Sequence, residues 1–470
     1  MEDSRFINNT TRGTATRGFG DRIGKKVWEV TNKYYSLSSP QLDIWLDQIL
    51  HPDVPLYNIG GYVGIDGPID PTLFEQGLNQ VIEENEALRI IIHGKEELPR
   101  QTFAENVRIN LDFQDFSTQE NAREATIEWM KQEFVKPFQL NNELLFDFAL
   151  CKAADNCYYW LNKYHHIIVD GWAISLIIQR LAAAYNALVT GTKCEAQYYS
   201  YQNFIQKDRA YLESEKFIKD RQYWQEKYRD IPDQLLVSRH AAQFGELPSK
   251  RSTLCLKRSF YNQLIEFAEE HNVSLFHVIL GALYCYFVRT DHREDFTIGS
   301  HLLNRNTVAF KKTVGMFMSD SPAWFRFGKD LSVVELIEKI RKELQKDYRH
   351  QRFPCSEISL QVGEHENENL LFDFTISYAK FDFDVHFNDN PSRSVYLHNG
   401  FDPCLEGLFI SIEEFHQQND VNIYFDYNLR FFDTDEIELF KARLEFLLGE
   451  IVQQPSVPVR EFQIIPDAEV

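Results

Sequence analysis

Two adjacent histidines, His165 and His166, end a segment whose composition is typical of a buried β-strand, YYWLNKYHH at residues 158–166. Successive side chains of a strand point to opposite faces of the sheet, so the two imidazoles cannot enter one cavity together. This spacing disfavours a metal site built from the pair. It leaves at most one histidine for general-base or positioning chemistry.

The residues that follow, IIVDG at 167–171, predict a turn into a helix over residues 172–188, where apolar side chains recur at helical spacing. Asp170 is well placed at the start of this helix for a buried ionic or hydrogen-bonded role. Gly171 allows a ligand to approach backbone N–H groups, which favour developing negative charge. The pattern therefore places a histidine beside a potential anion site.

A single histidine near an apolar strand is more often a hydrogen-bonded core residue than a catalytic one. The combination His-His-x-x-x-Asp-Gly at a strand-to-helix junction is more specific. It resembles the signature shared by condensation domains of nonribosomal peptide synthetases and the chloramphenicol acetyltransferase superfamily.

Other segments resemble condensation-domain motifs in the family's order, and together they extend over nearly all of residues 36–465. Two positions depart from the family pattern: Asn85 stands where a histidine is usual, and Asn203 stands where an acidic residue is usual. The segments are SSPQLDIW (38–45), ENEALR (84–89), YSYQNF (199–204), NR (304–305), VGMF (314–317) and RHQRFP (349–354).

The resemblance implies an α+β fold of two chloramphenicol acetyltransferase-like lobes, which form a V-shaped pseudo-dimer with a central tunnel. It implies that His166 is the catalytic residue that faces the reacting amine and thioester, and that the Gly171 backbone lies near the developing oxyanion. His165 is then structural, and Asp170 pairs with Arg305 to hold the loop. The candidates for lining the substrate tunnel are Trp172, Gly315, Phe317 and Ser319.

The resemblance also implies the substrates and partners. Substrates arrive on the 4'-phosphopantetheine of carrier proteins or as acyl-coenzyme A, with no permanently bound cofactor and no metal. The expected partners are an acceptor peptidyl carrier protein, an acyl-coenzyme A or acyl carrier protein donor, and adjacent synthetase domains; the protein is expected to be a monomer. A thioester is already activated and an α-amino group has a pKa of about 7.7–8.0, so His166 could act as a base or by positioning.

Composition narrows the remaining function classes. The chain has 470 residues and a net charge of -21, which disfavours nucleic acid as a partner. Its most apolar stretch, residues 276–288, is too short to span a membrane and predicts a buried helix.

The seven cysteines are scattered, which predicts reduced thiols rather than disulfides or a zinc site. The N-terminus has no signal-peptide pattern, so a cytoplasmic location is expected.

Four parts are expected along the chain: a flexible N-terminal extension (1–34), an acyltransferase-like lobe with the His motif (35–207), an inter-lobe helix and linker (208–234) and a second such lobe (235–470). An alternative for the extension is a docking tail. A helix is predicted after Ser38, with Leu42, Trp45, Leu46 and Ile49 on one face. Further helices are predicted at 73–88, 208–230, 261–270, 275–289, 333–351 and 435–453, strands at 144–150, 252–259, 295–301, 370–379, 408–414 and 421–428, and a linker at 453–458.

Several alternatives share these motifs. A stand-alone acetyltransferase of the chloramphenicol type is about half this length, which argues against it. An epimerase relative is possible, although the central motifs resemble condensation, and a cyclisation relative would carry Asp at the position of His165. A non-catalytic recruitment module tends to lose the His motif, which is intact here.

The segment from Lys311 to Pro322 resembles the starter subtype of condensation domain, with Lys-Thr-x-Gly-Met-Phe where extending domains usually differ. This implies N-acylation of the first amino acid by a fatty or other acyl group. The beginning of the chain at Met1 with a short lead-in also favours a first domain. Ordinary peptide elongation stays open as the alternative.

Overall fold

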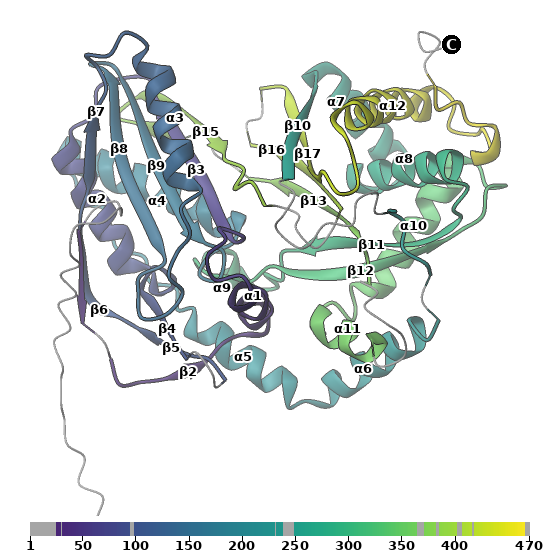
Figure 1. Ribbon diagram of the computed structural model, residues 1–470, viewed down its shortest axis with the longest axis horizontal. Helices are drawn as coiled ribbons and strands as arrows, with labels where there is room; N and C mark the ends of the chain where they lie inside the picture. Colours follow the sequence, from purple (N-terminus) through teal and green to yellow (C-terminus); the bar gives the residue numbers. More distant parts are fainter. Residues whose placement is uncertain are drawn as a thin grey trace, which may run out of the picture. The chain divides into compact units, whose positions relative to one another are not determined.

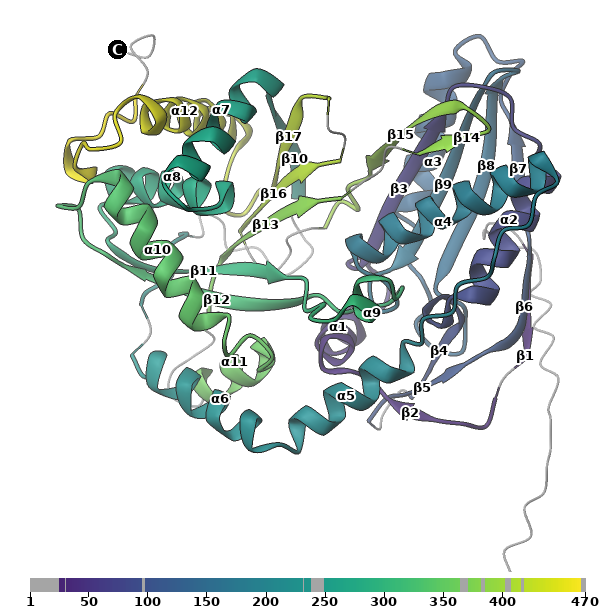
Figure 2. The same cartoon turned by 180° about the vertical axis from the view of Figure 1, so that it is seen from behind.

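The structure is a computed structural model that describes residues 25–29, 31–94, 98–230, 232–237, 249–363, 371–381, 385–401, 407–415 and 418–465 (Figures 1 and 2). Its compact units are interleaved along the chain. The first consists of Met1–Leu212, Arg305–Phe317 and Asp382–Asn399, and the second of Glu213–Asn304, Met318–Phe381 and Gly400–Val470. The continuous four-part division expected from the sequence stays a prediction.

The first unit is built around a six-stranded sheet of order β14-β15-β3-β9-β8-β7. Smaller sheets pair β1 with β6 and join β2, β5 and β4. The strands are β1 (Lys25–Glu29), β2 (Tyr35–Ser36), β3 (Asn58–Ile65), β4 (Ile90–His93), β5 (Arg100–Phe103), β6 (Glu105–Asn110), β7 (Asp112–Asp115), β8 (Phe146–Ala154), β9 (Cys157–His165), β14 (His386–Phe387) and β15 (Asn390–Tyr396).

Helices cover both faces of this sheet, with α3 in front in Figure 1 and α2 and α4 in front in Figure 2. Met130 and Phe134 of α3 pack on Leu161 of β9, whereas Phe74 of α2 contacts Trp160 on the opposite face. The helices are α1 (Ser39–Leu50), α2 (Pro71–Glu84), η1 (Glu86–Arg89), α3 (Ala122–Phe134), α4 (Gly171–Thr190), α5 (Gln202–Leu212) and α9 (Val308–Lys311). Because β9 lies between β3 and β8, its end is held from both sides.

The second unit contains a six-stranded sheet of order β10-β17-β16-β13-β11-β12. Its main apolar core includes residues of α7, α8, α10 and α12, and the predicted buried helix at 276–288 lies within α8. The elements are α6 (Glu215–Lys227), β10 (Ser249–Leu256), α7 (Arg258–Glu270), α8 (Leu275–Thr290), β11 (Asp295–Leu302), β12 (Ser319–Arg326), α10 (Val333–Asp347), α11 (Cys355–Gly363), β13 (Phe374–Lys380), β16 (Leu408–Glu414), β17 (Val421–Asn428), α12 (Thr434–Gln453) and η2 (Val459–Glu461).

The first predicted helix forms as α1, and part of its apolar face is exposed. Leu46 and Ile49 are 44% and 37% exposed, whereas Gln41 and Gln48 are buried together with Trp45. The two glutamines have polar partners inside the unit, so burying them leaves no unsatisfied amide. Apolar periodicity alone does not identify such a face.

Other differences concern element ends. Part of the expected flexible extension is ordered, since β1 pairs with β6 and Lys26 forms an ion pair with Asp147, with 2.7 Å between Nζ and Oδ1. The charged stretch at 208–230 is two helices, because Ser214 caps α6 by accepting from Phe217 N. Ser259 belongs to α7 rather than to a strand, and the helix from 333 ends at Asp347.

The linker expected at 453–458 packs onto the second unit. The N–H groups of Val333 and Val334 donate to the carbonyls of Val457 and Pro455, each over 3.1 Å, and Val459 is fully buried. Residue 370 of a predicted strand lies outside the described residues, and β13 begins at Phe374.

One described helix, α4, is long and apolar enough by itself to cross a membrane, and the bent pair α7 and α8 passes the same test jointly. In α4, 56% of the apolar window is buried inside the structure, as in the core helix of a globular protein. The feature is weak evidence for a span.

Candidate functional site

The histidine pair lies where the central strand β9 ends and the chain turns toward α4. The N–H of His165 donates to Leu145 O over 2.9 Å, and the N–H of His166 donates to Tyr57 O over 2.8 Å. The turn closes with a bond of 3.1 Å from Ile168 N to His165 O. The backbone of the pair is therefore bonded to segments beside the neighbouring strands.

His165 is an interior residue with polar partners. Its side chain accepts from Ile167 N through Nδ1 over 3.2 Å, and its Nε2 lies 3.1 Å from Gln48 Oε1. This pattern fits the neutral tautomer with hydrogen on Nε2. Burial, with smaller contributions from His166 and Lys163, lowers the pKa of His165 to about 3, so the ring is neutral at physiological pH.

His166 is half-buried, in contrast to His165, which is 1% exposed. The ring of Tyr57 lies edge-on to the His166 ring, with 6.5 Å between their centroids, and the Tyr57 hydroxyl donates to Asp47 over 2.6 Å. Of the two histidines, His166 is therefore the more exposed residue.

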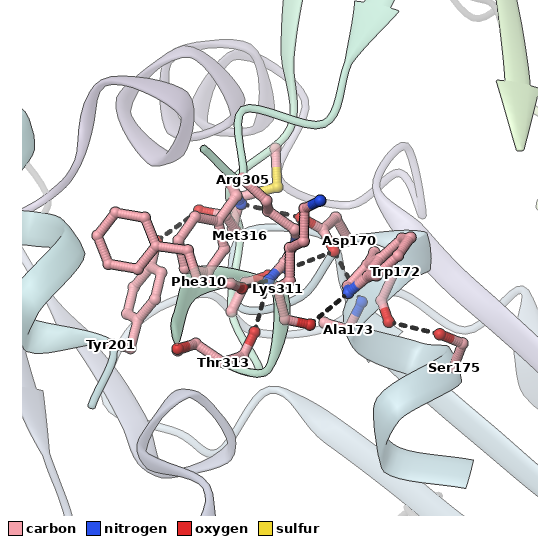
Figure 3. Close-up of polar contacts among 12 residues, drawn as sticks. Asp170, Trp172, Ala173, Ser175, Tyr201, Arg305, Phe310, Lys311, Thr313 and Met316 are labelled. Carbon is pink, nitrogen blue, oxygen red and sulfur yellow. Dashed lines mark hydrogen bonds and ion pairs between the residues drawn. The ribbon is translucent and has the colours of Figure 1, made fainter. Parts of the chain in front are cut away.

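Asp170 is held by several donors at the N-terminus of α4 (Figure 3). Its Oδ1 accepts from Ala173 N over 2.8 Å, and its Oδ2 accepts from Phe317 N over 3.0 Å. Arg305 Nη2 lies 2.8 Å and 3.0 Å from the two carboxylate oxygens, and both side chains are 1% exposed. The ion pair that the resemblance implies is therefore present and fully desolvated.

Arg305 connects this carboxylate to the chain around α9. Its Nη1 donates to the carbonyls of Phe310 and Thr313 over 2.6 Å each, and its Nη2 donates to Gly315 O over 3.1 Å. The guanidinium also lies over the Phe317 ring, 4.0 Å from the centroid. Such a fork of donors fixes the loop geometry and compensates part of the desolvation cost of the pair.

Gly171 and Trp172 form the first turn of α4. Gly171 is half-buried, and its position follows the capping residue directly. Trp172 Nε1 donates to Lys311 O over 2.8 Å, so the indole is fixed against α9 (Figure 3). These two residues therefore lie next to the Asp170 network.

The other tunnel candidates have different surroundings. Phe317 is fully buried, and its ring lies 4.3 Å from Phe204 and 5.4 Å from Tyr201, centroid to centroid. Gly315 is buried under the Tyr201 ring, where an added Cβ would come within 2.2 Å of a ring carbon. Ser319 is half-buried at the start of β12. For all three, a tunnel-lining role stays a prediction.

Three further residues support the turn and were not singled out in the sequence. Gln41 Nε2 donates to Ile167 O over 3.0 Å, and Gln48 contacts His165. Tyr201 donates to Met316 O over 2.7 Å. Gln41 and Tyr201 lie within two of the family motifs and Gln48 follows the first, but only the structure shows which groups these side chains contact.

Other motif segments also make contacts within their own units. Glu86 accepts from Gln202 Nε2 over 3.0 Å, which joins the second and third motifs, and Asn85 Nδ2 donates to Val81 O over 2.7 Å. His350 Nδ1 lies 2.7 Å from Asp220 Oδ1. Asn203 is exposed on α5. The Asn85 contact is structural, a helix-end hydrogen bond.

Among the described residues, no group of three or more His, Cys, Asp or Glu side chains could hold a metal ion. Six cysteines in the described ranges are free thiols, and Cys404 lies outside these ranges. Burial raises the pKa of the Cys285 thiol to about 12, so this thiol is protonated at physiological pH.

The sequence model of the Condensation domain family matches residues 31–470. The chain belongs to the condensation domain family. Condensation domains catalyse amide-bond formation, and the predicted family and α+β fold are confirmed.

Solved condensation domains share this fold. The starter condensation domain of rhizomide synthetase RzmA, in a mutant bound to C8-CoA, superposes with a TM-score of 0.81 at 26% identity, over 92% of this chain and 98% of that one. The first condensation domain of the calcium-dependent antibiotic synthetase gives a TM-score of 0.81 at 20% identity, over 93% of this condensation domain and 100% of that chain. The second likeness supports the fold alone.

The curated relatives are large synthetases. A dimodular nonribosomal peptide synthase of Bacillus subtilis is 29% identical over 88% of this chain, and surfactin synthase subunit 1 of the same organism is 25% identical over 93%. This condensation domain spans only 17% of the length of the first relative and 12% of the second. What the whole synthetases do therefore extends beyond one condensation domain.

Proposed function

We propose that this condensation domain forms an amide by attack of a carrier-bound aminoacyl amine on an acyl thioester, and that its reaction is N-acylation of the first amino acid of a nonribosomal peptide. The observation that carries the proposal is the His turn. There a half-buried His166 follows a neutral, buried His165 and precedes the desolvated Asp170–Arg305 pair.

Each part of the turn has a role in this proposal. The amine nitrogen attacks the thioester carbon, and His166 receives the ammonium proton as the tetrahedral intermediate forms, or positions the amine for attack. The C–S bond then breaks, and the thiolate leaves with that proton. The backbone at Gly171 stabilises the oxyanion at the positive end of the α4 dipole.

The remaining groups preorganise this chemistry. Asp170 and Arg305 fix the backbone from His166 to α4, which reduces the reorganisation needed when charge develops. His165 anchors the turn as a neutral hydrogen-bonding group. General-base action by a histidine is typically worth about 10²–10⁴-fold in rate.

Two observations support acylation over peptide elongation. The segment from Lys311 to Pro322 resembles the starter subtype, and the chain is similar at 26% identity to a starter condensation domain crystallised with C8-CoA. We therefore propose an acyl donor on coenzyme A or an acyl carrier protein, an aminoacyl acceptor on a peptidyl carrier protein, and neighbouring synthetase domains that supply both.

The test offers acyl-coenzyme A and acyl-carrier donors of graded chain length, beside a peptidyl-carrier donor, to one aminoacyl-carrier acceptor. Mass spectrometry identifies the amide. We expect use of acyl donors to increase with chain length until the donor channel is full, because each buried methylene contributes about 0.8 kcal/mol. Efficient peptidyl transfer without acyl transfer would leave elongation as the function, and no amide from any donor would leave a recruitment role.

A further inference from the structure

Tyr57 lies directly before β3 and contacts His166 through both its backbone and its side chain. Its carbonyl accepts from the N–H of His166 over 2.8 Å. Its ring stands edge-on to the His166 ring, at an angle of 80° and with 6.5 Å between the ring centroids. Aromatic pairs favour such an edge-to-face arrangement over a face-to-face one. One residue therefore bears on both the backbone and the imidazole of His166.

The side chain of Tyr57 is fixed at its far end. Its hydroxyl donates to Asp47 Oδ2 over 2.6 Å, and Asp47 belongs to α1. In Figures 1 and 2, α1 lies near the start of β3, in agreement with this bond. Hydrogen bonds to carboxylates are short and strong. The bond therefore restricts rotation of the phenol, and with it the placement of the ring edge beside His166.

The backbone around Tyr57 is held as well. Asn399 Nδ2 donates to the carbonyls of Leu56 and Asn58, the residues on either side of Tyr57, over 3.0 Å and 3.3 Å. Asn58 Nδ2 donates over 2.6 Å to the carbonyl of the last residue of α3. Asn58 and Asn399 are buried, so water competes little for these bonds. Tyr57 therefore presents its carbonyl and its ring from a backbone that is bonded on both sides.

We propose that Tyr57 is a positioning residue that sets the orientation of the His166 imidazole for attack of the amine. The inference rests on the proposed function and adds the side chain that orients its histidine. The Tyr57 ring limits the rotations open to the imidazole, and Asp47 limits the rotations open to the Tyr57 ring. Orientation of a catalytic group contributes to kcat rather than to substrate binding, so the expected signature is a lower kcat at constant KM.

The test compares Tyr57→Leu, which keeps the backbone carbonyl but removes the ring, with Tyr57→Phe, which keeps the ring but removes the bond to Asp47. The matched control is Tyr223→Phe in the second unit, where the Tyr223 hydroxyl donates to Asp347 over 2.7 Å and the ring stacks on His350. Each protein is assayed for kcat and KM with the acyl donor that gives the most amide and an aminoacyl-carrier acceptor. Thermal unfolding verifies folding.

We expect Tyr57→Leu to lower kcat about 10–100-fold with KM unchanged, because a displacement of about 1 Å at a reacting group costs up to about 10²-fold in rate. Tyr57→Phe and Asp47→Ala should each lower kcat about fivefold, whereas Asp47→Asn keeps an acceptor oxygen and should retain kcat. Tyr223→Phe should leave kcat unchanged. In the His166→Ala background, Tyr57→Leu should cause no further loss, since no imidazole is left to orient.

A spectroscopic measurement tests the contact without catalysis. In protein labelled with ¹³C at Cε1 of its histidines, the signal of His166 is assigned by its absence from His166→Ala. The ring current of Tyr57 contributes to the position of this signal. We expect Tyr57→Leu to move the His166 signal and to leave the His350 signal in place, and Tyr223→Phe to leave the His166 signal in place.

Four results overturn the proposal: unchanged kcat in a folded Tyr57→Leu protein, a loss confined to KM, an equal loss in the Tyr223→Phe control, or an unmoved His166 signal. If Tyr57→Leu does not fold, Tyr57→Phe and Asp47→Ala decide by the same kcat measurement. If the unchanged protein makes no amide from any donor while the His166 signal moves in Tyr57→Leu, the proposed function fails, whereas the orientation of His166 by Tyr57 stands.

Discussion

Two loops of this molecule each place a histidine near a buried carboxylate, and they use the pair differently. In the loop after α10, His350 binds Asp220 directly over 2.7 Å and stacks on Tyr223, with ring centroids 3.9 Å apart. In the turn after β9, Asp170 is bound by Arg305 and by two backbone N–H groups. One carboxylate holds a ring, and the other holds the backbone that carries a ring.

The comparison shows that a histidine near a buried carboxylate can have different roles, depending on which group the carboxylate binds. Tyr223 stacks on the face of the His350 ring, and Asp220 binds the ring nitrogen Nδ1. Trp224 Nε1 donates to the backbone carbonyl of His350 over 3.2 Å, so this loop joins α6 to α10. The His turn is equally well anchored, but its anchors are His165 and Asp170. His166 is thereby positioned by its neighbours, as the catalytic role that we propose for it requires.

The largest expected effect separates the two loops by activity. His166→Ala should lower kcat for amide formation by about 10²–10⁴-fold or more while leaving the unfolding temperature unchanged, because its loss removes base and positioning together. His350→Ala should lower stability but retain kcat in the folded protein. Steady-state assays with thermal unfolding measure both, and a well-folded, active His166→Ala protein refutes the assignment.

Removing the two carboxylates, one at a time, should lower the free energy of unfolding by different amounts. Asp170→Ala leaves Arg305 buried without its counter-ion, so we expect a loss of about 3–5 kcal/mol in unfolding free energy, with reduced activity. Asp220→Ala should cost less, since His350 is 23% exposed and water can solvate it. Urea denaturation of both variants gives the values, and equal costs would contradict the comparison.

The buried His165 ring should make the free energy of unfolding depend on pH. His165 has a folded pKa of about 3 against 6.5 for an unperturbed histidine, so between these values only the unfolded chain takes up the proton. Its contribution to stability is therefore complete above pH 6.5 and is lost as the pH falls toward 3. Replacing it with Gln should flatten the decline in unfolding free energy by up to about 1.4 kcal/mol per pH unit.

Urea denaturation from about pH 4 to 8 measures this slope for the unchanged protein and for His165→Gln. Carboxylates elsewhere titrate in both proteins, so only the difference between the two slopes reports on His165. Identical slopes would mean that the His165 ring becomes protonated in the folded state.

A smaller effect concerns the packing behind the turn. Gly315→Ala places a Cβ 2.2 Å from the Tyr201 ring, so we expect a loss of about 1–3 kcal/mol from overpacking. The matched change Gly449→Ala in α12 meets no atom within 4 Å and should stabilise the helix by about 1 kcal/mol. Thermal unfolding distinguishes the two, and a tolerated Gly315→Ala would show that Tyr201 is free to move.

Much of the site could be predicted from the sequence because the residues that indicate it lie close together along the chain. A strand that ends in His165-His166 and a helix that begins after Asp170 follow from side-chain periodicity and capping, and β9 and α4 occur where the pattern predicts them. The ordered series of motifs identified the family, and with it the partner of Asp170, 135 residues away.

The tertiary structure determined which polar side chains are buried, and the apolar periodicity of the sequence does not show this. Gln41 and Gln48 are buried, while Leu46 is exposed, because the interior beneath α1 supplies carbonyls and an imidazole that satisfy amides. The placement of residues 305–317 within the first unit follows from long-range bonds to Arg305 and Phe317, which leave no local pattern. Sequence specifies local conformation and chemistry, but which polar group is buried depends on the partners that folding brings to it.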